Sequence, residues 1–512
     1  MIAIARPDVV FDSDQAVDEM ALMRSAHFAQ FVGNYSRFGW SHPGPSWFYA
    51  LDPVYLSLGA HSWSLYVAFL TFHAVVGALV VVAVWRRGGP LLALIASCLL
   101  LVYLRAVGDE IFRVIWPPYL PLLTVVLFFI LAASGAAGST RAMVGALVVG
   151  SFAVQTHVST LPVILSVLAV TVALRVGVAM LSRRGAETSP RSRWVLPVTL
   201  AGLFLLALMW SPVMIEELSQ RPGNLTKLWW FFTTSYARHP YHEAVSAFGR
   251  MLQVYPFGVL PPRLEADFST LPSGRVVAIA IFMSGIGGLA IAATLLRDRF
   301  LQALAVLLVV ASSVTVLAMS RIVGPMFSYT FVWVTAYPLL LTIGWGALIV
   351  RTHPWTLWRG AAPRRVLEVA AAGLAIAVIS LSVGRFEALQ QLRSPAVEQV
   401  DPDTRPALGM VNRALATEPP QPLLVNIASH DRWEVSAGMA LALTKHGWKV
   451  TVTDGWVFMF GEATRSTGTE HVELIVADPK TADWIRLQMP DLQPIGNTQN
   501  TYLFIRHRSV RR

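Results

Sequence analysis

The sequence has little charge and almost no cysteine. Of its 512 residues, 14% are charged and 55% are hydrophobic, and Cys98 is the single cysteine. One cysteine excludes a disulfide within the chain. The low charge and the mean hydropathy of +0.55 are atypical of a soluble enzyme. These absences predict a polytopic membrane protein.

The positive charge is concentrated in short linkers between apolar runs. The formal net charge is +10, but a nucleic-acid-binding protein would carry its basic residues as a stripe on a folded surface. The arginines of alternate linkers are Arg86, Arg87, Arg141, Arg183, Arg184, Arg191, Arg193, Arg297, Arg299, Arg351, Arg359, Arg364 and Arg365. Linkers of this kind stay on the cytoplasmic side of a membrane. We therefore expect a lipid bilayer, and no nucleic acid, as a partner.

Apolar runs long enough to span a bilayer recur along the chain from residue 62 onwards. The predicted spans are 62–84, 90–105, 117–135, 142–157, 160–181, 194–212, 275–296, 300–319, 327–350 and 366–384. They form an α-helical bundle over residues 62–384, with a long outer loop at 213–274. Aromatic residues and prolines in this loop predict helices and turns that lie on the membrane surface.

Ten spans with these linker charges place both ends of the chain outside the cytoplasm. Residues 1–61 form the first outside loop, and they contain no apolar run long enough to carry them across the membrane. We therefore expect a further transmembrane helix encoded upstream of Met1.

The region after the last span changes character. A polar, proline-rich linker at 385–421 precedes a domain at 422–512. Strands are predicted at Leu423–Ala428, Lys449–Val452, Val472–Val476 and Thr501–Ile505, and helices at Arg432–His446 and Thr481–Met489. The pattern is that of a small α/β domain. It contains neither a Gly-x-Gly-x-x-Gly motif nor a P-loop, so no nucleotide site is predicted.

The stretch Tyr35–Tyr49 contains six aromatic residues, Arg37, His42 and a Pro-Gly-Pro turn. Trp and Tyr favour the headgroup layer of a membrane, and the prolines restrict the backbone next to His42. The stretch therefore predicts a rigid segment at the membrane surface. An interfacial anchor without a chemical role is the alternative.

Two acids precede this stretch. Asp12 and Asp14 could each serve as a general base that takes a proton from an attacking hydroxyl. They also stand just before a predicted helix, where side-chain oxygens accept backbone N–H bonds as an N-cap. The sequence leaves both interpretations open.

A second pair of acids follows the second predicted span. Asp109 is spaced i, i+4 from Arg105 and from Arg113, which predicts a surface on which these charges pair. Glu110 points about 100° away from that face and lacks such partners, so a contact with a metal or a substrate is an alternative role for it.

Further polar residues stand at the outer ends of spans. Gln155, Thr156 and His157 close the fourth span, where they either belong to a site or make hydrogen bonds between helices. Arg321, followed by Tyr329, lies where its guanidinium could bind a lipid phosphate in two places. Non-specific snorkelling to the headgroups is the alternative for Arg321.

These segments together resemble GT-C glycosyltransferases. That family has a polytopic bundle, an essential Asp in the first outside loop, acids in the second outside loop and often an outside C-terminal domain. The segments Gly33–Tyr49, Val154–Ser159 and Arg321–Tyr329 are similar to segments of a group of actinobacterial membrane proteins of GT-C type. The His-Pro-Gly-Pro block at 42–45 is the most specific part of the resemblance.

The resemblance implies a fold and an activity. The fold is an α-helical polytopic membrane bundle of about ten spans with a small C-terminal extracytoplasmic α/β domain. The activity is transfer, with inversion, of a hexosyl or pentosyl group from a polyprenyl-phosphate donor to a glycan or lipid acceptor of the cell envelope. It would take place at the outer face of a bacterial cytoplasmic membrane.

The resemblance also implies roles for residues. Asp14 would be the base, with Asp12 as its competitor, and Arg321 would hold the donor phosphate. The other residues expected to bind substrate are Arg37, His42, Glu110, Gln155, His157 and Tyr329. Glu110, His42 and His157 would shape the site or hold a divalent cation, Mg²⁺ or Mn²⁺, and Asp109 is a further candidate ligand. The second outside loop lacks Asp-x-Asp, so the metal requirement stays open.

A non-enzymatic membrane protein is the rival interpretation, either a transporter of lipid-linked substrates or a scaffold for envelope assembly. A transporter is expected to carry charged residues in the middle of its spans. Here the ionisable residues gather at the outer ends of the spans, which favours chemistry at the membrane surface.

Overall fold

The computed structural model describes residues 9–108, 114–183, 195–236, 238–257, 276–352, 400–489 and 492–507, with isolated positions between 365 and 376. The chain divides into two compact units. The bundle unit comprises residues 69–385, and the sheet unit comprises residues 1–68 together with residues 386–512. The two ends of the chain therefore belong to the same unit.

The first long helix, α4 (Ser62–Val107), bends sharply at Gly89. The φ angle of Gly89 is 76°, a left-handed conformation that glycine adopts without a steric penalty, and Pro90 follows it. The predicted spans 62–84 and 90–105 are the two arms of this bent helix.

The other helices of the bundle unit follow the predicted apolar runs. They are η1 (Pro117–Tyr119), α6 (Pro121–Ala136), α7 (Thr140–Thr156), η2 (Val158–Thr160), α8 (Leu161–Arg183), α9 (Val195–Ser219), α12 (Val276–Leu295), α13 (Arg299–Met319), η4 (Ser328–Thr335) and α14 (Ala336–Thr352). Among the described residues, seven helices are long and apolar enough to cross a membrane, with α4 counted once. The chain is therefore a multi-pass membrane protein. The predicted span at 366–384 lies mostly outside the described residues.

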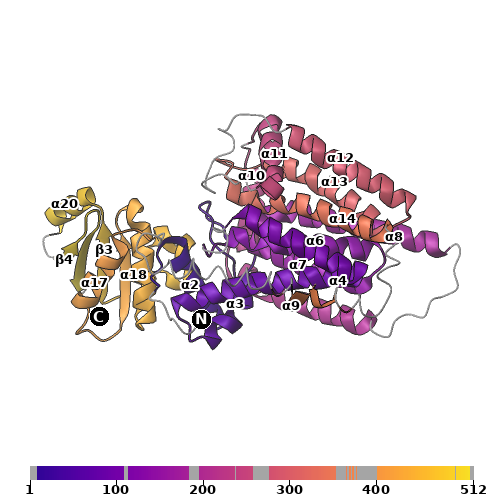
Figure 1. The fold of residues 1–512 in the computed structure, drawn as a ribbon. Coiled ribbons are helices and arrows are strands. Elements are labelled where there is room, and N and C mark those ends of the chain that lie inside the picture. The colour runs from indigo at the N-terminus through magenta and orange to yellow at the C-terminus, as the bar shows by residue number, and fades with distance from the viewer. Residues whose placement is uncertain are drawn as a thin grey trace. The chain divides into compact units, whose positions relative to one another are not determined.

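Helix α6 is the centre of the bundle unit (Figure 1). It is apolar on all sides, and such a helix must be buried on all sides. It contacts α7, α8, α13 and α14. Phe128 and Phe129 are fully buried, and the ring of Phe129 lies 5.6 Å from that of Tyr337 of α14.

Asp298 ties three helices together at the arginine-rich end of the bundle. Its carboxylate caps α13 by accepting from the backbone N–H groups of Phe300 (2.9 Å) and Leu301 (3.1 Å). It also pairs with Arg87 of α4 at 3.3 Å and with Arg351 of α14. These two arginines, predicted as topology signals, therefore also have a structural partner.

The outer loop contains two helices, α10 (Asn224–Thr234) and α11 (Tyr241–Phe257). Two carboxylates at the end of α9 hold the start of α10. Glu216 accepts from the backbone N–H of Asn224 at 2.8 Å, and Glu217 accepts from that of Leu225 at 2.7 Å. The expected helices are present, and their placement on a membrane surface stays a prediction.

The sheet unit contains one five-stranded sheet. Its strands are β1 (Pro422–Ile427), β2 (Lys449–Val452), β3 (Val472–Ala477), β4 (Gln493–Asn497) and β5 (Tyr502–His507), in the order β2-β1-β3-β5-β4. Strand β1 pairs in parallel with β2 and β3, whereas β5 is antiparallel to β3 and β4. The predicted strands are present. Strand β4 was not predicted, because it contains Pro494 and Gly496 and both residue types are unfavourable inside a strand.

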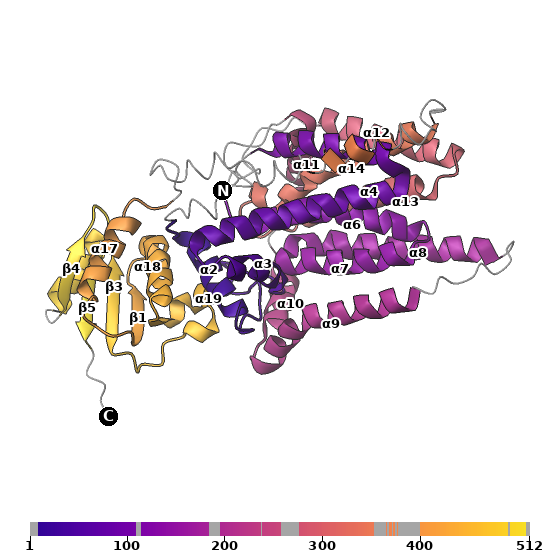
Figure 2. The same ribbon diagram turned by 60° about the horizontal axis from the view of Figure 1, so that its bottom comes forward.

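Helices cover both faces of this sheet. Helices α17 (Thr404–Ala414) and α18 (Trp433–Lys445) contact each other and lie beside the strands (Figure 2). Helix α20 (Pro479–Gln488) packs through Ala482 and Ile485 against Ile475 and Ala477 of β3. Every residue of β3 is buried, which explains why it reads as a continuous apolar run.

Two helices from the start of the chain complete the sheet unit. Helix α2 (Ser13–Ser25) packs on α18, on α3 (Ser46–Ser57) and on the short helix α19 (Val457–Phe460). Helix α3 buries Trp47 and Phe48 almost completely. The end of the Tyr35–Tyr49 stretch therefore has a face that packs inside the protein.

Candidate active site

The stretch Gly33–His42 folds back on itself. The backbone N–H of Gly33 donates to the carbonyl of His42 (3.0 Å), and that of His42 donates to the carbonyl of Asn34 (2.7 Å). Nearer the tip, the N–H of Ser36 donates to the carbonyl of Trp40 at 2.8 Å. Gly39 has a φ of 81° at the turn. Three backbone hydrogen bonds thus hold the segment, and its rigidity stays a prediction.

The hairpin, defined as residues 33–42, places Tyr35 against Asp14. The Tyr35 hydroxyl donates a hydrogen bond to the Asp14 carboxylate. Asp14 is half-buried in the first turn of α2, so its carboxylate is held in place while part of it stays accessible. The preceding residue, Ser13, has a φ of 51°. Non-glycine residues rarely adopt this conformation, and such strain gathers at functional sites.

Asp12 is more buried than Asp14 and binds a different part of the sheet unit. It is only 3% exposed. Its carboxylate accepts from the backbone N–H of Asp401 at 2.7 Å and from the hydroxyl of Thr404 at 2.9 Å. It stands at the N-cap position of α2, but its side chain makes no capping bond. Asp12 therefore joins α2 to the start of α17, and the geometry favours Asp14 over Asp12 as the base.

Asp18 lies one helical turn after Asp14. It is 1% exposed, and the Asn34 amide donates to its Oδ1. Burial raises the pKa of Asp18 well above its usual range, and the charge of Asp14 raises it further, while the bond from Asn34 lowers it. Asp14 and Asp18 therefore lie in different environments on one face of α2.

Glu434 was not predicted as a site residue. It is half-buried in the first turn of α18, where that helix follows the carboxyl end of β1. Burial raises the pKa of Glu434, three neighbouring carboxylates raise it further, and Arg432 lowers it. The three carboxylates are those of Asp12, Asp401 and Asp14. The position of Glu434 after a central parallel strand was the available signal.

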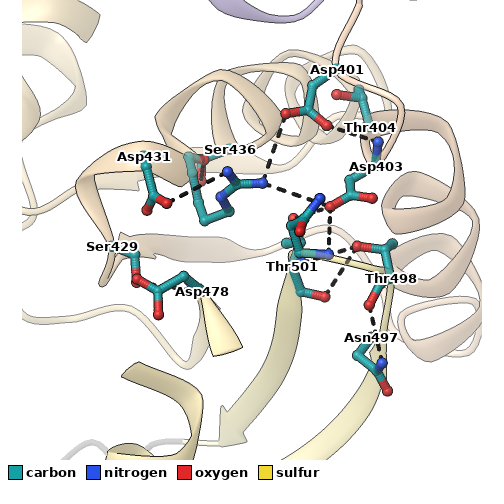
Figure 3. A network of polar contacts seen from close by, with 12 residues as sticks. Asp401, Asp403, Thr404, Ser429, Asp431, Ser436, Asp478, Asn497, Thr498 and Thr501 are labelled. Carbon is teal, nitrogen blue, oxygen red and sulfur yellow. Dashed lines mark hydrogen bonds and ion pairs between the residues drawn. The ribbon is translucent and has the colours of Figure 1, made fainter. Parts of the chain in front are cut away.

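A polar network lies at the same edge of the sheet (Figure 3). The Arg432 guanidinium lies 3.8 Å from Asp401 and 3.7 Å from Asp403. Asp403 also accepts from the Thr501 hydroxyl at 3.0 Å. Arg432 thus offsets the charge of carboxylates on the segment that Asp12 holds.

The hairpin carries two other candidates, Arg37 near its tip and His42 at its base. Arg37 is exposed, with its guanidinium carbon 5.2 Å from the centre of the Phe38 ring. The ring of His42 is half-buried and meets the Trp40 ring edge-on at 5.8 Å. Both side chains are thus held beside aromatic rings, Arg37 at the surface and His42 at the base of the hairpin.

Two polar candidates of the bundle unit have structural partners. The amide of Gln155 donates to the carbonyl of Met209 at 3.1 Å, which is the interhelical bond named as its alternative role. His157 Nδ1 lies 2.7 Å from the hydroxyl of Ser159, which also accepts from the indole of Trp333 at 3.0 Å. These contacts bring η2 and η4 together.

Arg321 lies just after α13, and Tyr329 lies at the start of η4. Arg321 is exposed. The ring of Tyr329 lies 4.6 Å from that of Trp116. His239 holds the segment through two bonds, from its backbone N–H to the carbonyl of Ser320 (3.0 Å) and between Nε2 and the carbonyl of Gly324 (2.8 Å). An exposed arginine on a braced segment suits phosphate binding.

The expected cation ligands, Asp109 and Glu110, lie outside the described residues. Within the part of the chain that the structure describes, no three His, Cys, Asp or Glu side chains are grouped so that they could hold a metal ion. The cation therefore stays an expectation that rests on Asp109 and Glu110.

The sequence matches no family model and no curated protein. Its structure is similar to the crystal structure of ArnT from Cupriavidus metallidurans bound to undecaprenyl phosphate, at 13% identity and a TM-score of 0.50. The match covers 97% of this chain and 94% of that chain. ArnT from the same organism in the apo state matches with 13% identity and a TM-score of 0.49. The first match and the described helices and strands together show the predicted fold class, a helical polytopic membrane bundle with a small C-terminal α/β domain.

Proposed function

We propose that this protein is a membrane glycosyltransferase that moves a sugar, with inversion, from a polyprenyl-phosphate donor to a glycan or lipid acceptor at the outer face of a bacterial cytoplasmic membrane. The observation that carries the proposal is the half-buried Asp14 carboxylate held by Tyr35, in a chain whose fold is similar over almost its whole length to that of ArnT. The ArnT structure contains undecaprenyl phosphate.

The residues suit the chemistry of such a transfer. Asp14 takes the proton of an acceptor hydroxyl, whose oxygen forms a bond to the anomeric carbon of the sugar. The bond from that carbon to the phosphate oxygen breaks, and polyprenyl phosphate leaves with the electron pair. Because attack and departure occur on opposite faces of the sugar, the configuration inverts. A phosphate leaving group needs little protonation, so one carboxylate base is sufficient.

The donor phosphate is assigned to Arg321. Its planar guanidinium can donate two parallel hydrogen bonds to phosphate oxygens and offset the negative charge that grows as the bond breaks. The contacts of His239 with the carbonyls of Ser320 and Gly324 brace this arginine's backbone. A divalent cation at Asp109 and Glu110 would offset phosphate charge in the same way.

The test is transfer from a panel of radiolabelled polyprenyl-phosphate sugars in membranes that contain the protein. Asp14→Asn keeps an acceptor for the Tyr35 hydroxyl but removes the base, so we expect about 10²- to 10⁴-fold slower transfer at equal protein level. Asp454→Asn, at an exposed carboxylate of the sheet unit, is the matched control and should leave the rate unchanged. Transfer that persists in Asp14→Asn contradicts the assignment of the base.

Asp12→Asn separates the two acids. Because Asp12 accepts two hydrogen bonds from the start of α17, its loss should lower the amount of folded protein. The transfer rate per folded molecule should stay close to that of the wild type. A rate per folded molecule as low as that of Asp14→Asn would instead make Asp12 the base.

A further inference from the structure

Two facing side chains in the sheet unit each keep one buried oxygen without a partner. The Asn34 amide nitrogen donates to Asp18 Oδ1. Among the described residues, neither Asp18 Oδ2 nor Asn34 Oδ1 has a hydrogen-bond partner. Asp18 is 1% exposed, so bulk solvent does not supply the missing bond. Buried polar atoms are rarely left unpaired, and each such atom needs an explanation.

A proton explains both atoms at once. An ionised carboxylate and an amide oxygen are both acceptors, so they cannot bond to each other. A neutral carboxylic acid has one O–H donor, and the oxygen that faces it in an acid–amide pair is the amide carbonyl. One acid and one primary amide can then form two hydrogen bonds in a ring, which satisfies every oxygen of the pair.

Each cation of the described helices that pack at Asp18 has another partner. Helix α2 packs against α3, α18 and α19. The charged residues of these four helices, apart from Asp18, are Asp14, Glu19, Arg24, Asp52, Glu434 and Lys445, and the hairpin adds the exposed Arg37. Lys445 pairs with Glu19, and Arg24 donates to Gln30 at 2.8 Å. Burial and the nearby Asp14 both raise the pKa of Asp18.

We propose that Asp18 is a neutral carboxylic acid in the folded protein, that its Oδ2–H donates to Asn34 Oδ1, and that this pair positions Tyr35 on Asp14. Asn34 is the chain neighbour of Tyr35 and the second residue of the hairpin, so fixing its side chain fixes the direction from which the Tyr35 hydroxyl reaches Asp14. A neutral Asp18 also leaves Asp14 without a second negative charge one helical turn away. The positioning role rests on the proposed function, whereas the protonation does not.

The protonation is tested with Asp18→Asn in the full-length protein. An amide at position 18 can form the same two bonds with Asn34, so this variant should fold. The infrared spectrum of the wild type minus that of Asp18→Asn at pH 7 should contain the carbonyl band of a protonated carboxylic acid. Absence of that band, or failure of Asp18→Asn to fold, overturns the proposal.

The pH dependence of unfolding gives an independent measurement. The folded wild type keeps a proton that the unfolded chain releases above the usual carboxyl pKa of about 4. The unfolding constant of the wild type relative to Asp18→Asn should therefore rise about tenfold for each pH unit above that value, until the folded pKa is reached. A ratio that stays constant between pH 4.5 and 7 contradicts a neutral Asp18.

The positioning role is tested by moving the acid. Asn34→Asp places two carboxyl groups face to face and should lower both stability and transfer at neutral pH, with recovery at lower pH as the pair takes up a proton. The exchanged variant, Asp18→Asn with Asn34→Asp, rebuilds one acid and one amide and should restore both. Failure of the exchange to restore transfer while stability returns would overturn the positioning role.

These readouts separate the two proposals. If no donor is used by any form of the protein but the infrared band and the pH-dependent unfolding are present, the proposed function fails and the neutral Asp18 stands. If wild-type transfer depends on Asp14 but the band is absent and the unfolding ratio does not change with pH, the neutral Asp18 fails and the proposed function stands.

Discussion

Lys445 should stabilise the sheet unit through a fully buried carboxylate. Glu19 of α2 is 0% exposed and accepts from the hydroxyls of Tyr55 (2.9 Å) and Ser62 (2.8 Å). Lys445 of α18 completes its partners and is the only cation paired with it among the described residues. The variant Lys445→Met keeps most of the side-chain length and removes the charge.

The expected loss follows from the exposure of the two partners. Removing one partner of a fully buried ion pair costs about 3–5 kcal/mol, whereas an exposed pair contributes about 0–1 kcal/mol. The Lys445 side chain is 26% exposed, and the Glu19 carboxylate keeps two hydroxyl donors. We therefore expect Lys445→Met to lower the free energy of unfolding by about 2 kcal/mol. For a unit of this size, that is a fall of roughly 4–8 °C in the unfolding midpoint.

The assay is thermal unfolding of the full-length protein in lipid nanodiscs, with limited proteolysis to follow the sheet unit separately from the bundle unit. Lys449→Met is the matched control, because Lys449 is an exposed lysine at the start of β2. The double variant with Glu19→Gln should lose less than the sum of the single losses, since both changes remove one interaction. Additive losses, or an unchanged midpoint in Lys445→Met, would refute the reasoning.

Three further outcomes follow from single sites. Burial raises the pKa of Asp52 from its usual 3.8 to about 6, although a hydrogen bond from Ser25 lowers it. The free energy of unfolding of the wild type, measured against that of Asp52→Asn, should therefore fall as the pH rises from about 4 to 6. Above pH 6 the difference between the two proteins should stay constant. A Cβ on Gly33 would lie 2.9 Å from the carbonyl oxygen of Gly44, so Gly33→Ala should open the hairpin and lower the transfer rate. Gly39 has a φ of 81° and open space around it, so Gly39→Asn should leave the transfer rate unchanged in the same assay. Arg321→Ala should raise the KM for the polyprenyl-phosphate donor, and Arg321→Lys should recover only part of the loss, because lysine offers no fork; an unchanged KM would remove Arg321 from the donor site.

The bundle could be predicted from the sequence because hydropathy is a local property. Each apolar run between 62–84 and 327–350 reports its own burial in lipid or protein, whatever the rest of the chain does. The strands of the small domain were predicted for a similar reason, since β1 and β3 are short apolar runs bounded by polar turns. Strand β4 carries proline and glycine, so it has no such local signal.

The sequence could not predict which segments form the sheet unit, because that depends on contacts between residues far apart in the chain. The bond between Asp12 and the backbone of Asp401 joins positions 389 residues apart. Neither residue stands in a pattern that reveals the other. For the same reason, Asp12 looked like an equal of Asp14, and Glu434 looked like an ordinary helix residue. The resemblance favoured Asp14, but the burial and the partners that distinguish the two acids are not visible in the sequence.

The discontinuous sheet unit has a consequence for how the protein is made. The ribosome synthesises residues 9–68 before the bundle and residues 400–507 after it, so α2 exists for the whole of bundle synthesis without the helix α18 on which it packs. During that interval the apolar side chains that α2 will bury against α18, and the Glu19 carboxylate that awaits Lys445, have no native cover. The N-terminal segment can therefore complete its folding only after the C-terminal segment has been synthesised. A nascent chain halted before residue 433 should therefore keep its N-terminal segment open to protease even when its spans are already inserted.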